Sequence, residues 1–228
     1  MEYFFATEFK DGYWFPDDTE SRHITKVLRK SNGQEITLVN GNGLRVKAQL
    51  EKIGKQLAVR EIEREELPRS DHLTIAVGPT KSADRMEWMI EKLVEIGVEK
   101  VVFIDTHNGE RSKMQERRIL MKAVAAMKQS LKVYLPEIEF GIPFEQLLYR
   151  TQSEQKFLAH CYSDIGAKFA PGEIRKSGSS VLVAIGPEGD FSRDEVEMAK
   201  AAEWQMLDLG TSRLRTETAA LVACTLMQ

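Results

Sequence analysis

The sequence predicts an α/β protein in which a small N-terminal β-barrel domain precedes a larger domain built on a parallel sheet. Residues 73–104 show a strand, an amphipathic helix and a second strand, which is the pattern of a βαβ unit. Residues 181–220 contain two further strand–loop–helix patterns, each with a glycine directly after its strand. The first 70 residues consist instead of short strand-like segments joined by turns, as in small barrels.

Composition bounds the class of protein. The 228 residues allow two small domains, and 42% hydrophobic with 29% charged residues is ordinary for a globular protein. The net charge of −3 means that any RNA-binding surface has to be local. Cys161 and Cys224 are far apart, which argues against a disulfide framework or a cysteine metal site. With no signal-peptide pattern and no apolar run of membrane length, we expect a cytoplasmic protein.

The N-terminal domain is predicted to contain strands over residues 35–39, 44–50 and 56–62. Residues 40–43, Asn-Gly-Asn-Gly, are a strong signal for a hairpin between the first two. Residues 61–71 are charged, contain a proline and lack apolar periodicity, so the linker is predicted there.

Two segments carry mostly basic charge. Within residues 22–30 no acidic residue interrupts Arg22, His23, Lys26, Arg29 and Lys30. Residues 111–132 hold one acidic residue, Glu116, and seven basic ones on a helical pattern, which are Arg111, Lys113, Arg117, Arg118, Lys122, Lys128 and Lys132. A basic helix face is usually only solvated, but it can also bind phosphates.

In the second domain, residues 73–77 and 101–104 are predicted strands. The helix between them places apolar residues on one face at Met86, Met89, Ile90, Leu93 and Val94, and Gly97 follows as its C-cap. We interpret the two methionines as core residues.

The C-terminal part begins with predicted strands over residues 157–160 and 181–185. Ser192 and Glu195 have the spacing of a capping box, which opens a helix that we expect to end near residue 204. A strand over residues 206–209, an arginine-containing loop and a final helix from Thr216 follow. Because loops after parallel strands meet at one edge of a sheet, and glycine permits close approach of a ligand, these loops predict a binding site.

The motifs GPEGDFS (186–192) and LGTSRLRTETAA (209–220) resemble the C-terminal signature of the RsmE family. Residues 21–43 resemble that family's PUA-like domain, and residues 78–98 resemble its first SPOUT motif. The resemblance implies a PUA-like RNA-binding barrel over residues 1–70 and a SPOUT methyltransferase domain with a C-terminal trefoil knot over 71–228. It implies a homodimer that uses S-adenosyl-L-methionine, and no metal, to methylate N3 of a uridine in 16S rRNA of the small ribosomal subunit.

Glycines after two strands, taken with this resemblance, predict the cofactor site. The predicted cofactor-binding residues are Leu158, Ala159, His160, Ile185, Gly186, Pro187, Glu188, Gly189, Leu209, Gly210, Leu214, Arg215, Thr216, Thr218 and Ala219. The basic segments and the resemblance together predict RNA contacts by Arg22, Lys26, Arg29, Lys81, Arg85, Arg111, Arg117 and Arg118.

The implied chemistry assigns catalytic candidates. Loss of the uridine N3 proton places negative charge on the flanking carbonyl oxygens, which a fixed guanidinium would stabilise. Arg215 is the first candidate and Arg213 the second, although Arg215 could instead pair with Glu217 or Glu188. Glu217, Glu188, His160 and bulk water are all candidates for the base.

Two other functions fit the same motifs. One is a SPOUT enzyme that acts on tRNA, and the other is a non-catalytic RNA-binding protein of this fold. The sequence lacks GxGxxG, GxxxxGK and GxSxG patterns and histidine pairs with metal spacing, which argues against dehydrogenases, P-loop enzymes, α/β-hydrolases and zinc enzymes.

Overall fold

A computed structural model of the chain describes residues 2–53, 56–69, 72–109, 114–165, 169–170, 176 and 178–228. The chain divides into two compact units, of which unit 1 comprises Met1–Ser70 and Val124–Leu135 and unit 2 comprises Asp71–Ala123 and Pro136–Gln228. The sequence interpretation did not assign Val124–Leu135 to the first unit. Within the described ranges, no helix has the length and apolar character needed to cross a membrane.

Unit 1 is built on a six-stranded sheet. Its order is β1 (Tyr3–Phe5), β4 (Glu35–Val39), β5 (Leu44–Ile53), β6 (Gln56–Glu66), β3 (Tyr13–Phe15) and β2 (Glu8–Lys10), with β1 and β4 parallel and the other pairs antiparallel. The pairing of β4 with β5 confirms the predicted hairpin. Two short helices follow β3, namely α1 (Asp18–Arg22) and the π-helix η1 (His23–Val27). Closure of this sheet into a barrel stays a prediction.

The prediction of a linker over residues 61–71 was wrong for residues 61–66, because β6 continues to Glu66. Two of these charged residues face opposite charges on the neighbouring strand β5, since Glu63 lies opposite Lys47 and Glu65 lies opposite Arg45. Arg45 Nη2 lies 2.5 Å from Glu65 Oε2, and these two residues are directly opposite in the register. Cross-strand ion pairs of this kind stabilise a solvated strand that lacks apolar alternation.

The segment Val124–Leu135 is tied to the rest of unit 1 by specific contacts. It contains the end of α3 (Glu116–Gln129). Lys128 Nζ lies 2.6 Å from Glu20 Oε2, and both side chains are largely buried. Tyr134 donates a hydrogen bond to the carbonyl of Leu67 at 2.7 Å. A Cβ atom at Gly43 would lie 2.3 Å from Tyr134 Oη, so glycine is required at that turn.

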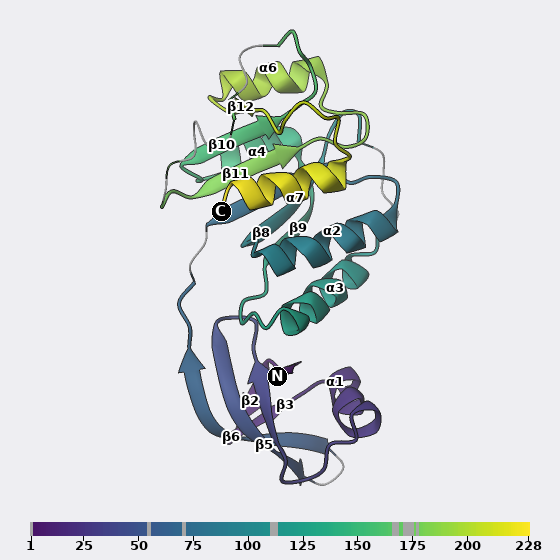
Figure 1. Cartoon of the computed structure of the whole chain (residues 1–228), viewed down its shortest axis with the longest axis vertical. Coiled ribbons are helices and arrows are strands. Elements are labelled where there is room, and N and C mark those ends of the chain that lie inside the picture. Colours follow the sequence, from purple (N-terminus) through teal and green to yellow (C-terminus); the bar gives the residue numbers. More distant parts are fainter. Residues whose placement is uncertain are drawn as a thin grey trace. The chain divides into compact units, whose positions relative to one another are not determined.

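Unit 2 is an all-parallel sheet with helices on both faces (Figure 1). The strand order is β12 (Gln205–Leu207), β10 (Gln155–Ala159), β11 (Val181–Ile185), β7 (Leu73–Val77), β8 (Lys100–Asp105) and β9 (Glu137–Pro143). The first strand of the unit, β7, therefore pairs with β11 on one side and β8 on the other. Such a reversal of strand order leaves a crevice beyond the carboxyl ends of the strands, where ligands bind.

The helices cover the sheet as their apolar faces dictate. Helices α2 (Ala83–Ile96) and α7 (Thr216–Leu226) lie side by side, and α7 contacts the central strands β7 and β11 (Figure 1). Helices α4 (Phe144–Arg150) and α6 (Arg193–Ala201) pack against each other on the opposite face. Met86 and Met89 are fully buried, which confirms their interpretation as core residues.

Most predicted elements of unit 2 are confirmed, with shifted ends. Strands β7 and β11 have the predicted bounds. Ser192 and Glu195 form the predicted capping box, but the helix ends at Ala201, because Glu203 adopts a left-handed conformation (φ 63°). Strand β12 ends at Leu207, so Leu209 and Gly210 belong to the loop that follows.

Candidate functional site

A cavity of about 800 Å³ lies beyond the carboxyl ends of β10, β11 and β12. Its wall contains the last residue of each of these strands, which are Ala159, Ile185 and Leu207. The remaining wall comes from the loops at 160–162, 186–190 and 208–215, from the start of α7 and from Arg85. We call this space the loop cavity. It has the volume and the position that are typical of small-molecule sites in parallel sheets.

The three loops are fixed to one another by hydrogen bonds. Thr216 Oγ1 donates to the carbonyl of Gly186 at 3.0 Å and so joins α7 to the loop after β11. Asp190 Oδ2 accepts from the backbone N–H of Cys161 at 2.7 Å and joins the loop after β10 to that after β11. From the loop after β8, the Asn108 amide donates to the carbonyls of Gly189 and Asp190 at 3.1 and 3.2 Å. These hydrogen bonds hold the loops in place, so the cavity is already formed without a ligand.

Glycine at position 186 is required by this arrangement of loops. A Cβ atom there would lie 3.0 Å from both Asp190 Oδ1 and the backbone nitrogen of Phe191. Contacts this short force the loop to shift. A side chain at position 186 would therefore strain this loop even before a ligand binds.

Arg85 takes the ionic role that the sequence interpretation offered to Arg215. Its Nη1 lies 3.4 Å from Glu188 Oε1, and its Nε lies 3.7 Å from Glu217 Oε1. Arg215 and Arg213 are exposed on the cavity wall and make no ion pair with any described residue. Glu217 is only 5% exposed, and its second oxygen, Oε2, is buried without a hydrogen-bond partner in the described part of the chain.

The structure brings together most of the predicted cofactor-binding residues. All of them line the loop cavity except Leu158 and Thr218. The Leu158 side chain is fully buried in the core between the sheet, α4 and α6, and Thr218 lines an adjoining cavity. Arg85 was predicted as an RNA contact but lines the loop cavity. Sequence reasoning missed seven wall residues that lie within the two glycine motifs or close to predicted site residues, namely Cys161, Tyr162, Asp190, Leu207, Asp208, Thr211 and Ser212.

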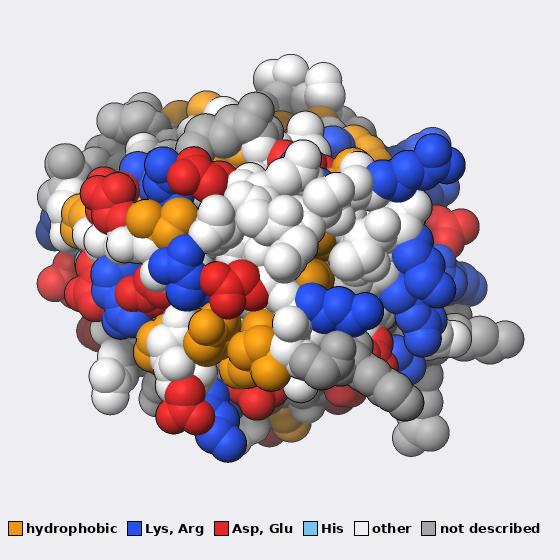
Figure 2. Space-filling model, turned by 90° about the horizontal axis from the view of Figure 1, so that it is seen from below, with side chains coloured by type: hydrophobic (Ala, Val, Ile, Leu, Met, Phe, Trp, Pro, Cys, Tyr) orange, Lys and Arg blue, Asp and Glu red, His pale blue; other side chains and the backbone are white. Residues whose placement is uncertain are grey.

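The predicted RNA-binding residues differ in their surroundings. Arg22, Lys26 and Arg29 are exposed on unit 1, and Lys81 and Arg117 are exposed on unit 2. Figure 2 shows several Lys and Arg side chains at the right of that view, and others interspersed with Asp and Glu side chains at its left. Arg118 instead forms a two-pronged ion pair with the buried carboxylate of Glu87, at 2.7 and 3.1 Å. Arg111 lies outside the described residues.

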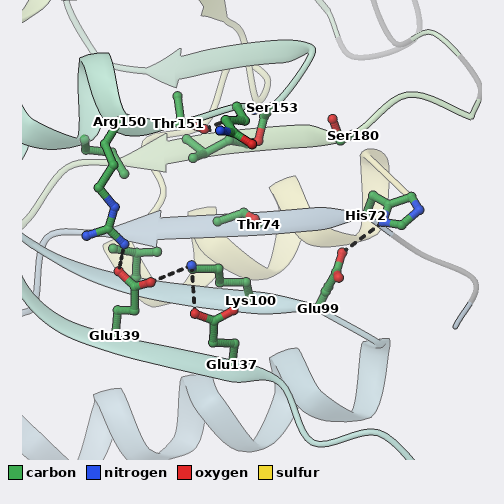
Figure 3. Close-up of a pocket in the computed structure, with 14 residues that line it drawn as sticks. His72, Thr74, Glu99, Lys100, Glu137, Glu139, Arg150, Thr151, Ser153 and Ser180 are labelled. Atoms are coloured by element: carbon green, nitrogen blue, oxygen red, sulfur yellow. Dashed lines mark hydrogen bonds and ion pairs between the residues drawn. The ribbon is translucent and has the colours of Figure 1, made fainter. Parts of the chain in front are cut away.

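A second cavity, of about 490 Å³, lies at the opposite, amino ends of the strands. Its charged residues satisfy one another (Figure 3): Lys100 Nζ lies 2.9 Å from Glu137 and 2.5 Å from Glu139, and Arg150 pairs with Glu139. His72 Nδ1 lies 3.3 Å from Glu99 in the same cavity. This arrangement is an ion-pair network that joins β8, β9 and α4.

We expect this network to make stability depend on pH through Glu139. Partial burial raises the pKa of Glu139, but hydrogen bonds from Lys100 and Arg150 outweigh it and hold the pKa below its ordinary value. A lowered folded-state pKa contributes stability above the unfolded pKa, and this contribution is lost as pH falls through the folded pKa. Glu139→Gln should therefore cost about 1–2 kcal/mol at pH 7, and the difference from wild type should shrink as pH falls below the ordinary glutamate pKa and through the lowered pKa of Glu139.

Chemical denaturation at a series of pH values measures this difference. Glu137→Gln is a matched control, because Glu137 binds the same lysine but its side chain is 61% exposed. Its effect should be much smaller. Equal effects of the two substitutions at pH 7 would contradict a special role for Glu139.

Comparison with known proteins places this chain in a family. Residues 65–228 match the family model described as an RNA methyltransferase domain, and residues 16–62 match an RNA methyltransferase PUA domain. The ribosomal RNA small subunit methyltransferase E of Bacillus subtilis is 30% identical over 220 residues, which cover 90% of this chain and 85% of that protein. The protein of the same name from Rickettsia conorii is 28% identical over 213 residues, with 90% and 85% covered.

Solved structures agree. A probable rRNA methyltransferase from Porphyromonas gingivalis is 39% identical, with a TM-score of 0.91 over 98% of this chain and 95% of that one. A ribosomal RNA small subunit methyltransferase E from Neisseria gonorrhoeae, solved bound to S-adenosyl methionine, is 28% identical, with a TM-score of 0.84 over 100% of this chain and 97% of that one. Together with the loop cavity, these matches show that the chain belongs to the ribosomal RNA small subunit methyltransferase E family of RNA-methylating enzymes.

Proposed function

We propose that this protein transfers a methyl group from S-adenosylmethionine to N3 of a uridine in 16S rRNA of the small ribosomal subunit. The observation that carries the proposal is the loop cavity, which is preformed beyond the carboxyl ends of β10, β11 and β12 and lined by the two glycine motifs. It is supported by the family and by the cofactor in the structure of the Neisseria gonorrhoeae relative.

The residues of the loop cavity suit this cofactor. Backbone groups at Gly186, Gly189, Leu209 and Gly210 are accessible from the cavity and offer hydrogen bonds. Leu214, in the loop at 208–215, and Ala219, in α7, supply apolar parts of the cavity wall. The cofactor supplies an electrophilic methyl group when bound, so the protein has to supply orientation and control of charge.

The reaction forms an N3–CH₃ bond, breaks the S–CH₃ bond and releases the N3 proton. Arg215 is exposed on the cavity wall without an ionic partner among the described residues, so its guanidinium is available to the uracil oxygens. Glu217 is the favoured base, because its Oε2 is buried beside the cavity without a donor. Glu188 is exposed and paired with Arg85, which makes it less suited to accept the proton.

The experiment that tests the proposal compares substrates. Purified protein and labelled S-adenosylmethionine should methylate small-subunit particles or 16S rRNA, and nucleoside mass spectrometry should identify 3-methyluridine. Methylation of tRNA instead would support the first rival function. Cofactor binding without methyl transfer to either RNA, or no cofactor binding at all, would leave the non-catalytic RNA-binding protein as the better interpretation.

The proposal includes the finer architecture that the family resemblance implies. We propose that unit 1 closes into a PUA-like barrel, that the C-terminal loops form a trefoil knot, and that the protein acts as a homodimer in the cytoplasm. Helix α7 supports contact with a second subunit. It is rich in apolar residues, and one of them, Leu226, is 48% exposed. A helix that is apolar on most sides needs cover on several sides.

RNA binding should depend steeply on salt, because each phosphate contact releases counterions. Arg117→Glu reverses an exposed charge of unit 2 and should weaken binding to any RNA sequence, without changing cofactor affinity. Fluorescence polarisation at several salt concentrations measures the slope. A flat salt dependence would exclude phosphate contacts by this surface. Arg118→Glu is less informative, because it also leaves the buried Glu87 carboxylate without its partner.

A further inference from the structure

A third cavity, of about 640 Å³, adjoins the loop cavity. Its wall consists of Asp84, Arg85, Trp88, Arg213, Leu214, Arg215, Glu217 and Thr218, all within unit 2. Five of these residues also line the loop cavity, namely Arg85, Arg213, Leu214, Arg215 and Glu217. The loop residues 213–215 and the buried carboxylate of Glu217 therefore form a wall that the two cavities share. A group held in the third cavity would present one edge to the loop cavity across this shared wall.

Trp88 distinguishes the third cavity from the loop cavity. Its side chain is 46% exposed, whereas Trp14 and Trp204 are 5% and 4% exposed. It lies on the outer face of α2, whose inner face, with Met89 and Ile90, is fully buried. An indole on a cavity wall beside arginines offers a flat surface on which a nucleobase can stack.

Glu217 provides a second, independent indication of a ligand. The residue is only 5% exposed, and its Oε2 atom has no hydrogen-bond partner in the described part of the chain. A buried carboxylate oxygen without a donor is costly, and such groups are normally satisfied. Because Glu217 lines both cavities, a rotation of its carboxylate would bring Oε2 to a ligand N–H at the shared wall and satisfy it.

We propose that the third cavity is the subsite for the target nucleobase, with Trp88 as its stacking surface and Glu217 Oε2 as the acceptor of its imide N–H. The proposal rests on the proposed function, since it places the base next to a cofactor in the loop cavity. It commits to a pyrimidine with an imide N–H, such as uracil. Cytosine has an acceptor at the same ring position and would meet the carboxylate without a hydrogen bond.

Substitution of Trp88 in the full-length protein tests the proposal. Trp88→Ala should lower kcat/KM for 16S rRNA or small-subunit particles about 5- to 100-fold, the scale of losing one stacked base. Trp88→Phe should restore most of the activity, because it keeps an aromatic face. Cofactor affinity, thermal unfolding and sedimentation should match wild type. Tyr149→Ala is the matched control, because Tyr149 is 75% exposed and lines neither cavity, and it should change nothing.

Fluorescence gives a readout that does not depend on turnover. Trp88 is the exposed tryptophan of the three in this chain, so a short oligouridine should quench the emission of wild type and not that of Trp88→Phe. Oligocytidine should quench less.

An unchanged kcat/KM in Trp88→Ala would overturn the proposal, and so would quenching by oligouridine in Trp88→Phe that equals the quenching in wild type. A changed sedimentation coefficient in Trp88→Ala would also overturn it, because it would assign Trp88 to a subunit interface. Failure of the wild-type protein to bind S-adenosylmethionine would instead contradict the proposed function.

Discussion

Replacing Arg215 by alanine is expected to lower the rate of methyl transfer about 100-fold or more, with cofactor affinity close to that of wild type. The expected loss is large because a guanidinium beside the developing charge stabilises that charge more in a partly enclosed cavity than in bulk water. The structure strengthens the expectation. The carboxylates that could have held Arg215 as a structural partner, Glu188 and Glu217, are both within 3.7 Å of Arg85 instead.

The pH dependence separates this role from a general contribution to RNA binding. The imide of uridine is mostly neutral at neutral pH, so stabilisation of its anion matters most there. As pH rises, deprotonation needs less help, and the deficit of Arg215→Ala should shrink. Single-turnover rates at saturating RNA, measured across a pH series, show whether it does.

Arg213→Ala is the matched control for Arg215, because it lies in the same loop, is also exposed and lines the same two cavities. A smaller deficit without pH dependence is expected for it. If Arg215→Ala keeps the wild-type rate across the pH range, Arg215 has no role in stabilising the anion. Equal, pH-independent deficits in both variants would indicate contact with phosphate.

Valine at position 186 is expected to weaken S-adenosylmethionine binding about 10- to 100-fold, the scale of 1–3 kcal/mol for overpacking of a tight site. Its Cβ would approach Asp190 and Phe191 to 3.0 Å, and the loop that binds Cys161 through Asp190 would have to move. Isothermal titration calorimetry measures the change. Thermal unfolding checks that the fold is retained.

Gly178→Asn is a suitable control for Gly186→Val, because asparagine tolerates a left-handed backbone conformation better than most residues. Gly178 has a positive φ of 78°, no atom near the position of an added Cβ and no place in the loop cavity. It should keep wild-type cofactor affinity. An unchanged affinity in Gly186→Val would show that the cofactor does not depend on the loop after β11.

The sequence by itself determined the features that depend on neighbouring residues. The apolar run at 181–185, the turn at 40–43 and the capping box of Ser192 and Glu195 were all confirmed, because strand propensity, turn chemistry and capping act over a few residues. The family was also identified from sequence, because its two signature motifs are contiguous and lie close together in the chain. The same motifs located the cavity wall.

Only the tertiary structure decided which charges are paired. Arg85 and Glu217 are 132 positions apart in the chain, Arg118 and Glu87 are 31 apart, and Lys128 and Glu20 are 108 apart. No local pattern links such residues, so sequence reasoning left Arg215 with two possible partners and treated Lys128 as part of a basic surface. Burial then gives each pair its meaning, because a carboxylate removed from water needs a partner, and Glu217 Oε2 has none among the described residues.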